Sequence, residues 1–214
     1  MIMLPFLARV DANTSSATTE KRVRYPPEET EEKHRKILEE ASRAFRAKGF
    51  AGISISDIMK ATGLTHGPFY NHFASKNALI EDVIDQTAAN TVKVFSEVAK
   101  EDGNTGIYRH YVSKSHRDEP ETGCIFAACG PEISRDDSFR KVTAIHIEHH
   151  IQTLEAGLEA SSRTSSRAEA VAQFATMVGA IVLSRMCADT PLSDEILQAS
   201  LKELDRTTST GLQN

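Results

Sequence analysis

The chain has 214 residues, of which 40% are hydrophobic, and a net charge of −5. This apolar content is enough for one large domain or two small ones, and the overall acidity excludes a uniformly basic nucleic-acid binder. Three cysteines are too few for a disulfide framework. Because no apolar run approaches the roughly 20 residues of a membrane helix, we expect a cytoplasmic protein.

Charge is unevenly distributed along the chain. Residues 33–76 contain eight basic and three acidic residues, a net of +5, so the remainder carries −10. A basic segment on an acidic body indicates that one end of the protein meets a polyanion.

The first helix is expected to follow a disordered arm. Residues 1–27 are rich in Ser, Thr and Ala and end in a proline break, which is typical of disorder. Helical periodicity begins at Thr30, the predicted cap, and ends at Lys48, where Gly49 suits a left-handed cap. The apolar stripe consists of Ile37, Leu38, Ala41, Ala44 and Phe45.

Two short helices joined by a tight turn come next. Ser54 and Asp57 form a capping-box-like start for a helix over 55–62, which Gly63 ends. Thr65 is expected to cap a third helix over 65–73, with Pro68 in its first turn. This pattern predicts a helix-turn-helix, in which the second helix enters the DNA major groove.

The rest of the chain also has helical periodicity. Ser75 is the predicted cap of a fourth helix that runs to about residue 100. Further helices are expected over 104–116, 122–134, 137–160, 166–187 and 193–205. Strand-like alternation never extends beyond four residues. The fold class is therefore predicted to be all-α.

Residues 33–80 resemble the DNA-binding domain of the tetracycline-repressor (TetR) family of bacterial transcriptional regulators. After the arm over 1–27 that composition predicts, the resemblance implies a helix-turn-helix DNA-binding domain (28–90) with three N-terminal helices, and a larger C-terminal helical bundle (91–214) for ligand binding and dimerisation. The matching residues are Ile37-Leu38, Ala41, Phe45, Gly49-Phe50, Ser54-Ile55, Asp57-Ile58, Ala61, Gly63-Leu64-Thr65, Gly67, Phe69-Tyr70, His72-Phe73, Ser75-Lys76 and Leu79.

The same resemblance assigns DNA contacts residue by residue. Phosphate contacts are implied for Ser54, Tyr70, His72 and Lys76. Base reading would fall to Thr65, His66, Gly67, Pro68 and Asn71. The chain departs from the family pattern at Ile53, where many members have Thr, and at Pro68, where a small or hydroxyl residue is commoner. Both departures bear on the operator sequence.

In this family a small molecule enters the C-terminal bundle and moves the fourth helix. By two-state logic, an inducer must bind the DNA-incompetent form more tightly. Pocket candidates are apolar or aromatic positions with a polar neighbour, and each also fits simple core packing. These candidates are Phe95, Tyr108, Tyr111, Phe126, His146, His150, Phe174 and Met177.

Cys124 leaves a second kind of sensing open. It opens the predicted helix over 122–134, and a helix N-terminus lowers a thiol pKa. This would suit an electrophile or redox sensor, whereas a buried cysteine would be inert. Cys129 lies five residues on, off the same helical face, so an intrahelical disulfide is not expected.

Histidines at 146 and 150 share a helical face, as metal ligands can. The adjacent glutamate needed for a metalloprotease pattern is absent, and no paired Glu-x-x-His sets of a ferritin-like enzyme occur. We therefore expect no metal, no cofactor and no enzymatic activity.

The helix over 166–187 is apolar nearly all round, so it is expected to pack on its own subunit and on a two-fold mate. A homodimer with two reading heads implies a palindromic operator. The sequence thus predicts a DNA-binding regulator, a repressor released by a small-molecule inducer, with no membrane partner. The alternative that the protein activates transcription stays open.

Overall fold

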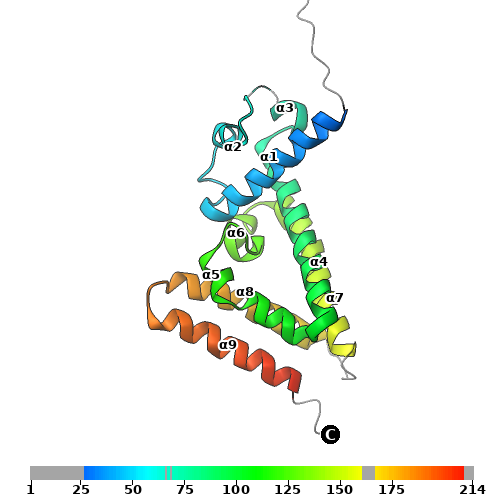
Figure 1. The fold of residues 1–214 in the computed structure, drawn as a ribbon, viewed down its shortest axis with the longest axis vertical. Coiled ribbons are helices and arrows are strands. Elements are labelled where there is room, and N and C mark those ends of the chain that lie inside the picture. Colours follow the sequence, from blue (N-terminus) through cyan, green and yellow to red (C-terminus); the bar gives the residue numbers. More distant parts are fainter. Residues whose placement is uncertain (1–26, 66, 68, 161–166, 210–214) are drawn as a thin grey trace, which may run out of the picture.

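The computed structural model describes residues 27–65, 67, 69–160 and 167–209, which form helices and no strand (Figure 1). The predicted all-α class is confirmed. None of the described helices is long and apolar enough to cross a bilayer. The helices are α1 (Pro27–Lys48), α2 (Ile55–Thr62), α3 (Phe69–His72), α4 (Lys76–Tyr111), α5 (Lys114–Asp118), α6 (Ile125–Ile133), α7 (Asp137–Ala160), α8 (Arg167–Met186) and α9 (Pro191–Ser209).

The head of the molecule consists of α1, α2, α3 and the start of α4. The Ser54 hydroxyl accepts a hydrogen bond from the Asp57 N–H, and the Asp57 carboxylate accepts one from the Ser54 N–H, so the predicted capping box is confirmed. Gly63 ends α2 with a φ of 72°. Side chains buried within the head include Ile37, Phe45, Ile58, Phe69 and Leu79.

Two helix starts differ from the prediction. α1 begins at Pro27 rather than at Thr30, because proline suits the first helical position, where its missing N–H has no intrahelical partner. α3 is a single turn that begins at Phe69, so Thr65 is not its cap. Gly67 lies in a turn, which its backbone freedom favours over helix.

The long helix α4 is kinked within its C-terminal part. Gly103 has φ 60° and ψ −154°, and the helix resumes beyond it as far as Tyr111. The predicted helix over 104–116 therefore belongs to two elements. Its second part is α5, which the Ser113 hydroxyl caps by accepting a hydrogen bond from the His116 N–H at 3.2 Å.

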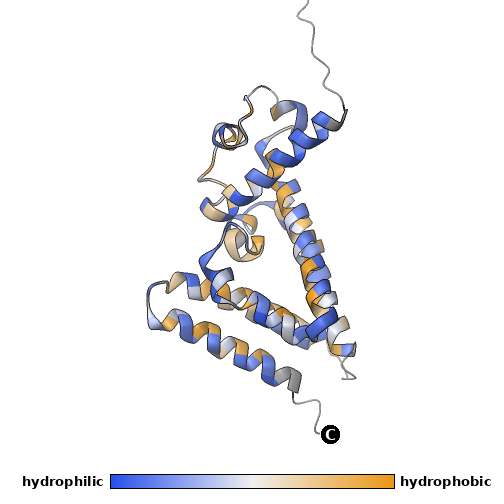
Figure 2. Ribbon diagram, in the orientation of Figure 1, coloured by the Kyte–Doolittle hydropathy of each residue, from blue (hydrophilic) through white to orange (hydrophobic). Residues whose placement is uncertain are grey.

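The body of the molecule is built around α4 and α7, which run side by side (Figure 1). α8 and α9 also pair with each other along the base of the view, and α6 lies directly beneath α1. Figure 2 shows mainly hydrophilic colouring on α1 and hydrophobic colouring on α6. The apolar helix α6 thus joins the head to the body.

Candidate nucleic-acid interface and cavity

In the helix-turn-helix, polar side chains are exposed while neighbouring apolar side chains are buried. Phe69 is fully buried, whereas Tyr70 is 61% exposed and Asn71 is exposed. The rings of Phe69 and Tyr70 meet edge to face at 5.2 Å between centroids. Thr65 and Gly67 are exposed on the preceding turn. The remaining two predicted base-reading residues, His66 and Pro68, lie outside the described residues.

His72 is half-buried next to α1. Its ring centroid lies 5.8 Å from that of His34, which stacks on Phe73 at 4.5 Å. Burial, and then the charges of His34 and Lys33, lower the pKa of His72. At neutral pH its imidazole is therefore a neutral hydrogen-bonding group rather than a cation.

Lys76 makes hydrogen bonds within the head of the molecule. Its ammonium donates to the carbonyl oxygens of Phe50 and Ile53, each at 2.5 Å, and lies 5.8 Å from the centroid of the Phe45 ring. Lys76 thereby holds the α1–α2 loop (residues 49–54) against the start of α4. A phosphate contact from the same ammonium stays a prediction.

Glu132 of α6 holds the same loop from the body side. Its two carboxylate oxygens accept hydrogen bonds from the N–H groups of Phe50 and Ala51, each at 3.0 Å. Sequence reasoning missed this contact. The signal in the sequence is weak, since it is one glutamate at the end of a short apolar helix.

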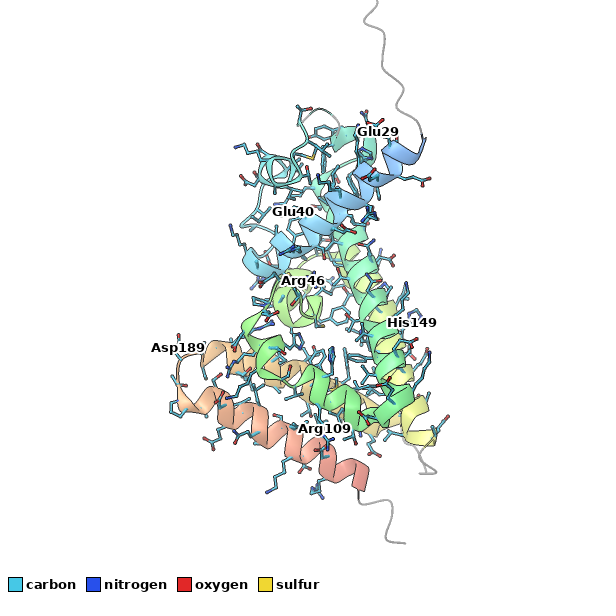
Figure 3. All side chains as sticks on the ribbon, in the orientation of Figure 1. Glu29, Glu40, Arg46, Arg109, His149 and Asp189 are labelled. Carbon is cyan, nitrogen blue, oxygen red and sulfur yellow. The ribbon has the colours of Figure 1, made fainter. Side chains whose placement is uncertain are left out.

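A second contact joins the head to the body through Arg46. Its Nη1 donates to the Gly123 carbonyl oxygen at 2.7 Å, and its Nε donates to the Ser42 carbonyl oxygen at 3.1 Å. Figure 3 shows Arg46 between α1 and α6. The Ser42 hydroxyl also hydrogen-bonds the Thr87 hydroxyl at 2.9 Å, which fixes α1 to α4.

A cavity of about 690 Å³ lies beside these contacts. Its walls come from α1, α4 and residues 110–124. Three residues singled out from the sequence line it, namely Phe95, Tyr111 and Cys124. A smaller cavity of about 410 Å³ lies between α6 and α7 and is lined in part by Phe126.

The other pocket candidates form the core of the body. His150 is fully buried, with its ring centroid 5.4 Å from Phe95, 5.5 Å from Phe126 and 5.1 Å from Phe174. Burial lowers the pKa of His150 to about 4, while its Nδ1 donates to the His146 carbonyl oxygen at 2.6 Å.

Three further candidates are also buried. His146 hydrogen-bonds Asp85 at 2.8 Å, and Tyr108 and Met177 are fully buried. None of these three residues lines either of the two cavities described above. Among the described residues, no group of three or more metal-ligating side chains converges.

Cys124 is buried at the start of α6 and forms no disulfide with a described cysteine. Its N–H donates to His116 Nε2 at 2.9 Å, and its side chain makes no capping hydrogen bond. Cys129 is also free, and its thiol donates to the Phe45 carbonyl oxygen at 3.4 Å. Burial raises the pKa of Cys129 to about 12, whereas Cys124 lies in the wall of the larger cavity.

Comparisons with known proteins agree with this geometry. Residues 37–83 match the family model described as bacterial regulatory proteins, tetR family. Over 66 residues the chain is 41% identical to the HTH-type transcriptional regulator YvdT of Bacillus subtilis, covering 31% of this chain and 34% of that one. Over 63 residues it is 38% identical to TtgR of Pseudomonas putida, covering 29% and 30%. The matches thus span about a third of these curated relatives.

Solved structures share the fold over most of the chain. NemR of E. coli, in its reduced form, has a TM-score of 0.70 and 19% identity, covering 82% of this chain and 96% of that one. A TetR transcriptional regulator of Chloroflexus aurantiacus has a TM-score of 0.68 and 23% identity, covering 84% and 95%. The fold is therefore that of these regulators.

Proposed function

The chain carries the N-terminal helix-turn-helix domain of the tetR family of bacterial regulatory proteins, and from this premise we propose that it is a sequence-specific DNA-binding transcriptional regulator. It acts as a repressor that a small-molecule inducer releases from a palindromic operator. The observation that carries the proposal is the family match over residues 37–83, which coincides with α2, α3 and their supporting helices.

Residues 28–90 are the proposed DNA-binding domain and residues 91–214 the sensing and dimerisation domain. The arm expected over 1–27 lies outside the described residues except for Pro27, which begins α1. Phosphates are contacted from both ends of the helix-turn-helix, and base edges are read by the turn and by α3. The proposed phosphate contacts are Ser54, Tyr70, His72 and Lys76, and the proposed base contacts are Thr65, His66, Gly67, Pro68 and Asn71.

The proposed dimer interface lies on α8 and α9. Large apolar side chains there face solvent, with Val171 42%, Leu183 52%, Met186 77% and Leu192 49% exposed. Burying these side chains against a second copy would be favourable, and a two-fold dimer presents two reading heads to two half-sites. This supports a palindromic operator.

The test is binding of the purified full chain to the DNA upstream of its own gene, with excess nonspecific competitor, and selection from random DNA if that fragment fails. Competitor-resistant binding with a palindromic footprint is expected. Asn71→Ala should alter the selected sequence, whereas Tyr70→Phe should weaken binding to all sequences alike. If neither DNA source yields a specific site, the proposal is wrong.

A thiol-based sensor is the second candidate, because Cys124 lines the larger cavity. In this version an electrophile or oxidant modifies Cys124 and releases the operator. Alkylation of native protein should release DNA in the parent chain and in Cys129→Ser, but not in Cys124→Ser. Release that persists in Cys124→Ser would exclude this mechanism.

A further inference from the structure

Arg46 is a half-buried cation that makes no ion pair with a described residue, although the charge of Glu121 acts on it. Its guanidinium donates only to the carbonyl oxygens of Ser42 and Gly123, and no carboxylate of the described residues makes an ion pair with it. Burial lowers the pKa of Arg46, although the group stays charged at neutral pH. A charge removed from water without a partner is costly, so such a group favours an anion brought in by a ligand.

Arg46 lines the 690 Å³ cavity together with a buried hydroxyl that lacks an oxygen or nitrogen partner. Tyr111 is 2% exposed, and among the described residues the groups that act on its hydroxyl are the Cys124 thiol and the charge of Arg185. A phenolic hydroxyl is a donor as well as an acceptor. Together, Tyr111 and Arg46 offer hydrogen-bond donors from two walls of one cavity.

A second guanidinium adds positive charge next to the same turn. Arg185 of α8 donates to the carbonyl oxygens of His116 and Arg117, at 2.6 Å and 3.0 Å, and its buried Nη1 has no described partner. A Cβ placed on Gly123 would lie 3.2 Å from Arg185 Nη2, so Arg185 and Arg46 flank Gly123.

The acidic residues of the cavity restrict the charge of its ligand. Glu39 is paired with Arg35 at 2.8 Å, whereas Glu119 and Glu121 line the cavity without an ion pair to Arg46, and of these two only Glu121 acts on Arg46, through its charge and from a distance. Their carboxylates would repel a ligand that carries several negative charges. A single anionic group at Arg46 is therefore favoured, and Val94 and Phe95 supply apolar wall for the rest of the molecule.

We propose that the cavity between α1, α4 and residues 110–124 binds an organic monoanion, with its anionic group at Arg46 and Tyr111 and its apolar body against Phe95 and Val94. The volume suits a small organic ligand, since such pockets measure about 300–1,000 Å³. As an assignment of the inducer's chemical class, the inference rests on the proposed regulatory function.

The location also gives the anion an effect on the head. Arg46 belongs to α1, and its Nη1 bond to the Gly123 carbonyl joins α1 to the turn before α6. An anion that takes donors of Arg46 competes with that carbonyl and weakens the contact. The bound and free states then differ in how α1 is held, which is the differential interaction that an inducer requires.

The test uses two fluorescent probes that share one ring system, the anionic anilinonaphthalene sulfonate and the neutral phenylnaphthylamine. Each is titrated into the full chain and its Arg46→Gln, Arg46→Lys, Tyr111→Phe and Arg43→Gln variants. Arg46→Gln should weaken sulfonate binding about tenfold or more, since a hydrogen bond to a charged group is lost. Arg46→Lys, which keeps the charge, should lose less, and Tyr111→Phe should weaken the sulfonate alone.

Phenylnaphthylamine reports whether the cavity survives each substitution, so its affinity should change little. Arg43→Gln is the matched control, because Arg43 lines the same cavity but is exposed. Equal losses in Arg43→Gln and Arg46→Gln, equal losses of both probes, or no saturable sulfonate binding to the parent chain would each overturn the proposal. Operator binding by unliganded protein is measured separately, so failure of the regulatory function and failure of the anion site give different results.

Discussion

Glu132 is predicted to stabilise the whole fold by holding the head to the body. The Glu132→Ala substitution leaves the N–H groups of Phe50 and Ala51 without their carboxylate acceptors, each now at 3.0 Å. A hydrogen bond to a charged group contributes about 1.5–3 kcal/mol, and an exposed one contributes less. Because Ala51 is exposed and water replaces its partner, we expect a total loss of about 2–4 kcal/mol in the free energy of unfolding.

Urea unfolding followed by far-UV circular dichroism measures this loss, and amide hydrogen exchange at Phe50 and Ala51 measures the local effect. Glu132→Gln keeps one oxygen acceptor and should lose about half as much. Glu101→Ala removes an exposed carboxylate on α4 and should change stability by less than about 0.5 kcal/mol. If Glu132→Ala matched Glu101→Ala and left both amides protected, the two hydrogen bonds would not be stabilising contacts.

Burial lowers the pKa of His116 and His150 from 6.5 to about 4. As pH falls from 6.5 to 4 the unfolded chain binds protons that the native chain does not, so the free energy of unfolding should fall by up to about 3 kcal/mol per histidine. Urea unfolding measured between pH 6.5 and 4 tests this prediction, with substitution of the exposed His149 (His149→Gln) as the control. A free energy of unfolding that does not change over this range would contradict it. The Lys76→Met substitution should weaken DNA binding and should also leave the Phe50 carbonyl oxygen without its hydrogen-bond donor. If the dependence of DNA affinity on salt concentration did not change, Lys76 would not contact a phosphate. Met186→Asp places a charge on the exposed α8–α9 face and should shift sedimentation towards monomer; an unchanged mass would move the interface elsewhere.

Features set by residues close in sequence could be predicted well. Ser54 and Asp57 satisfy each other across three positions, and Ser75 caps α4 by accepting a hydrogen bond from the Ala78 N–H at 3.1 Å. Gly49 has a φ of 75°, as a left-handed cap requires. Such interactions depend on local chain geometry alone, which is why the pattern of residues predicts them.

The contacts between head and body could not be predicted in the same way. Arg46 meets Gly123 across 77 positions, and Glu132 meets Phe50 across 82. Neither pair has a periodic or motif signal, because both depend on where α6 packs. For the same reason, Phe95 and His150 were equally good pocket candidates in the sequence, although Phe95 lines the larger cavity and His150 lies in the core.

The kink at Gly103 has a mechanical consequence. A straight helix transmits displacement along its own axis, but α4 changes direction at Gly103, where the backbone has a φ of 60°. Tyr111 lies beyond this bend and Lys76 before it. We therefore expect displacement of the cavity wall beyond the bend, at Tyr111, to reach the head as a shear between α6 and α1, with Gly123 and Glu132 at the contacts that carry it. The α1–α6 junction, rather than the length of α4, would then set how stiffly the two ends of the molecule are coupled.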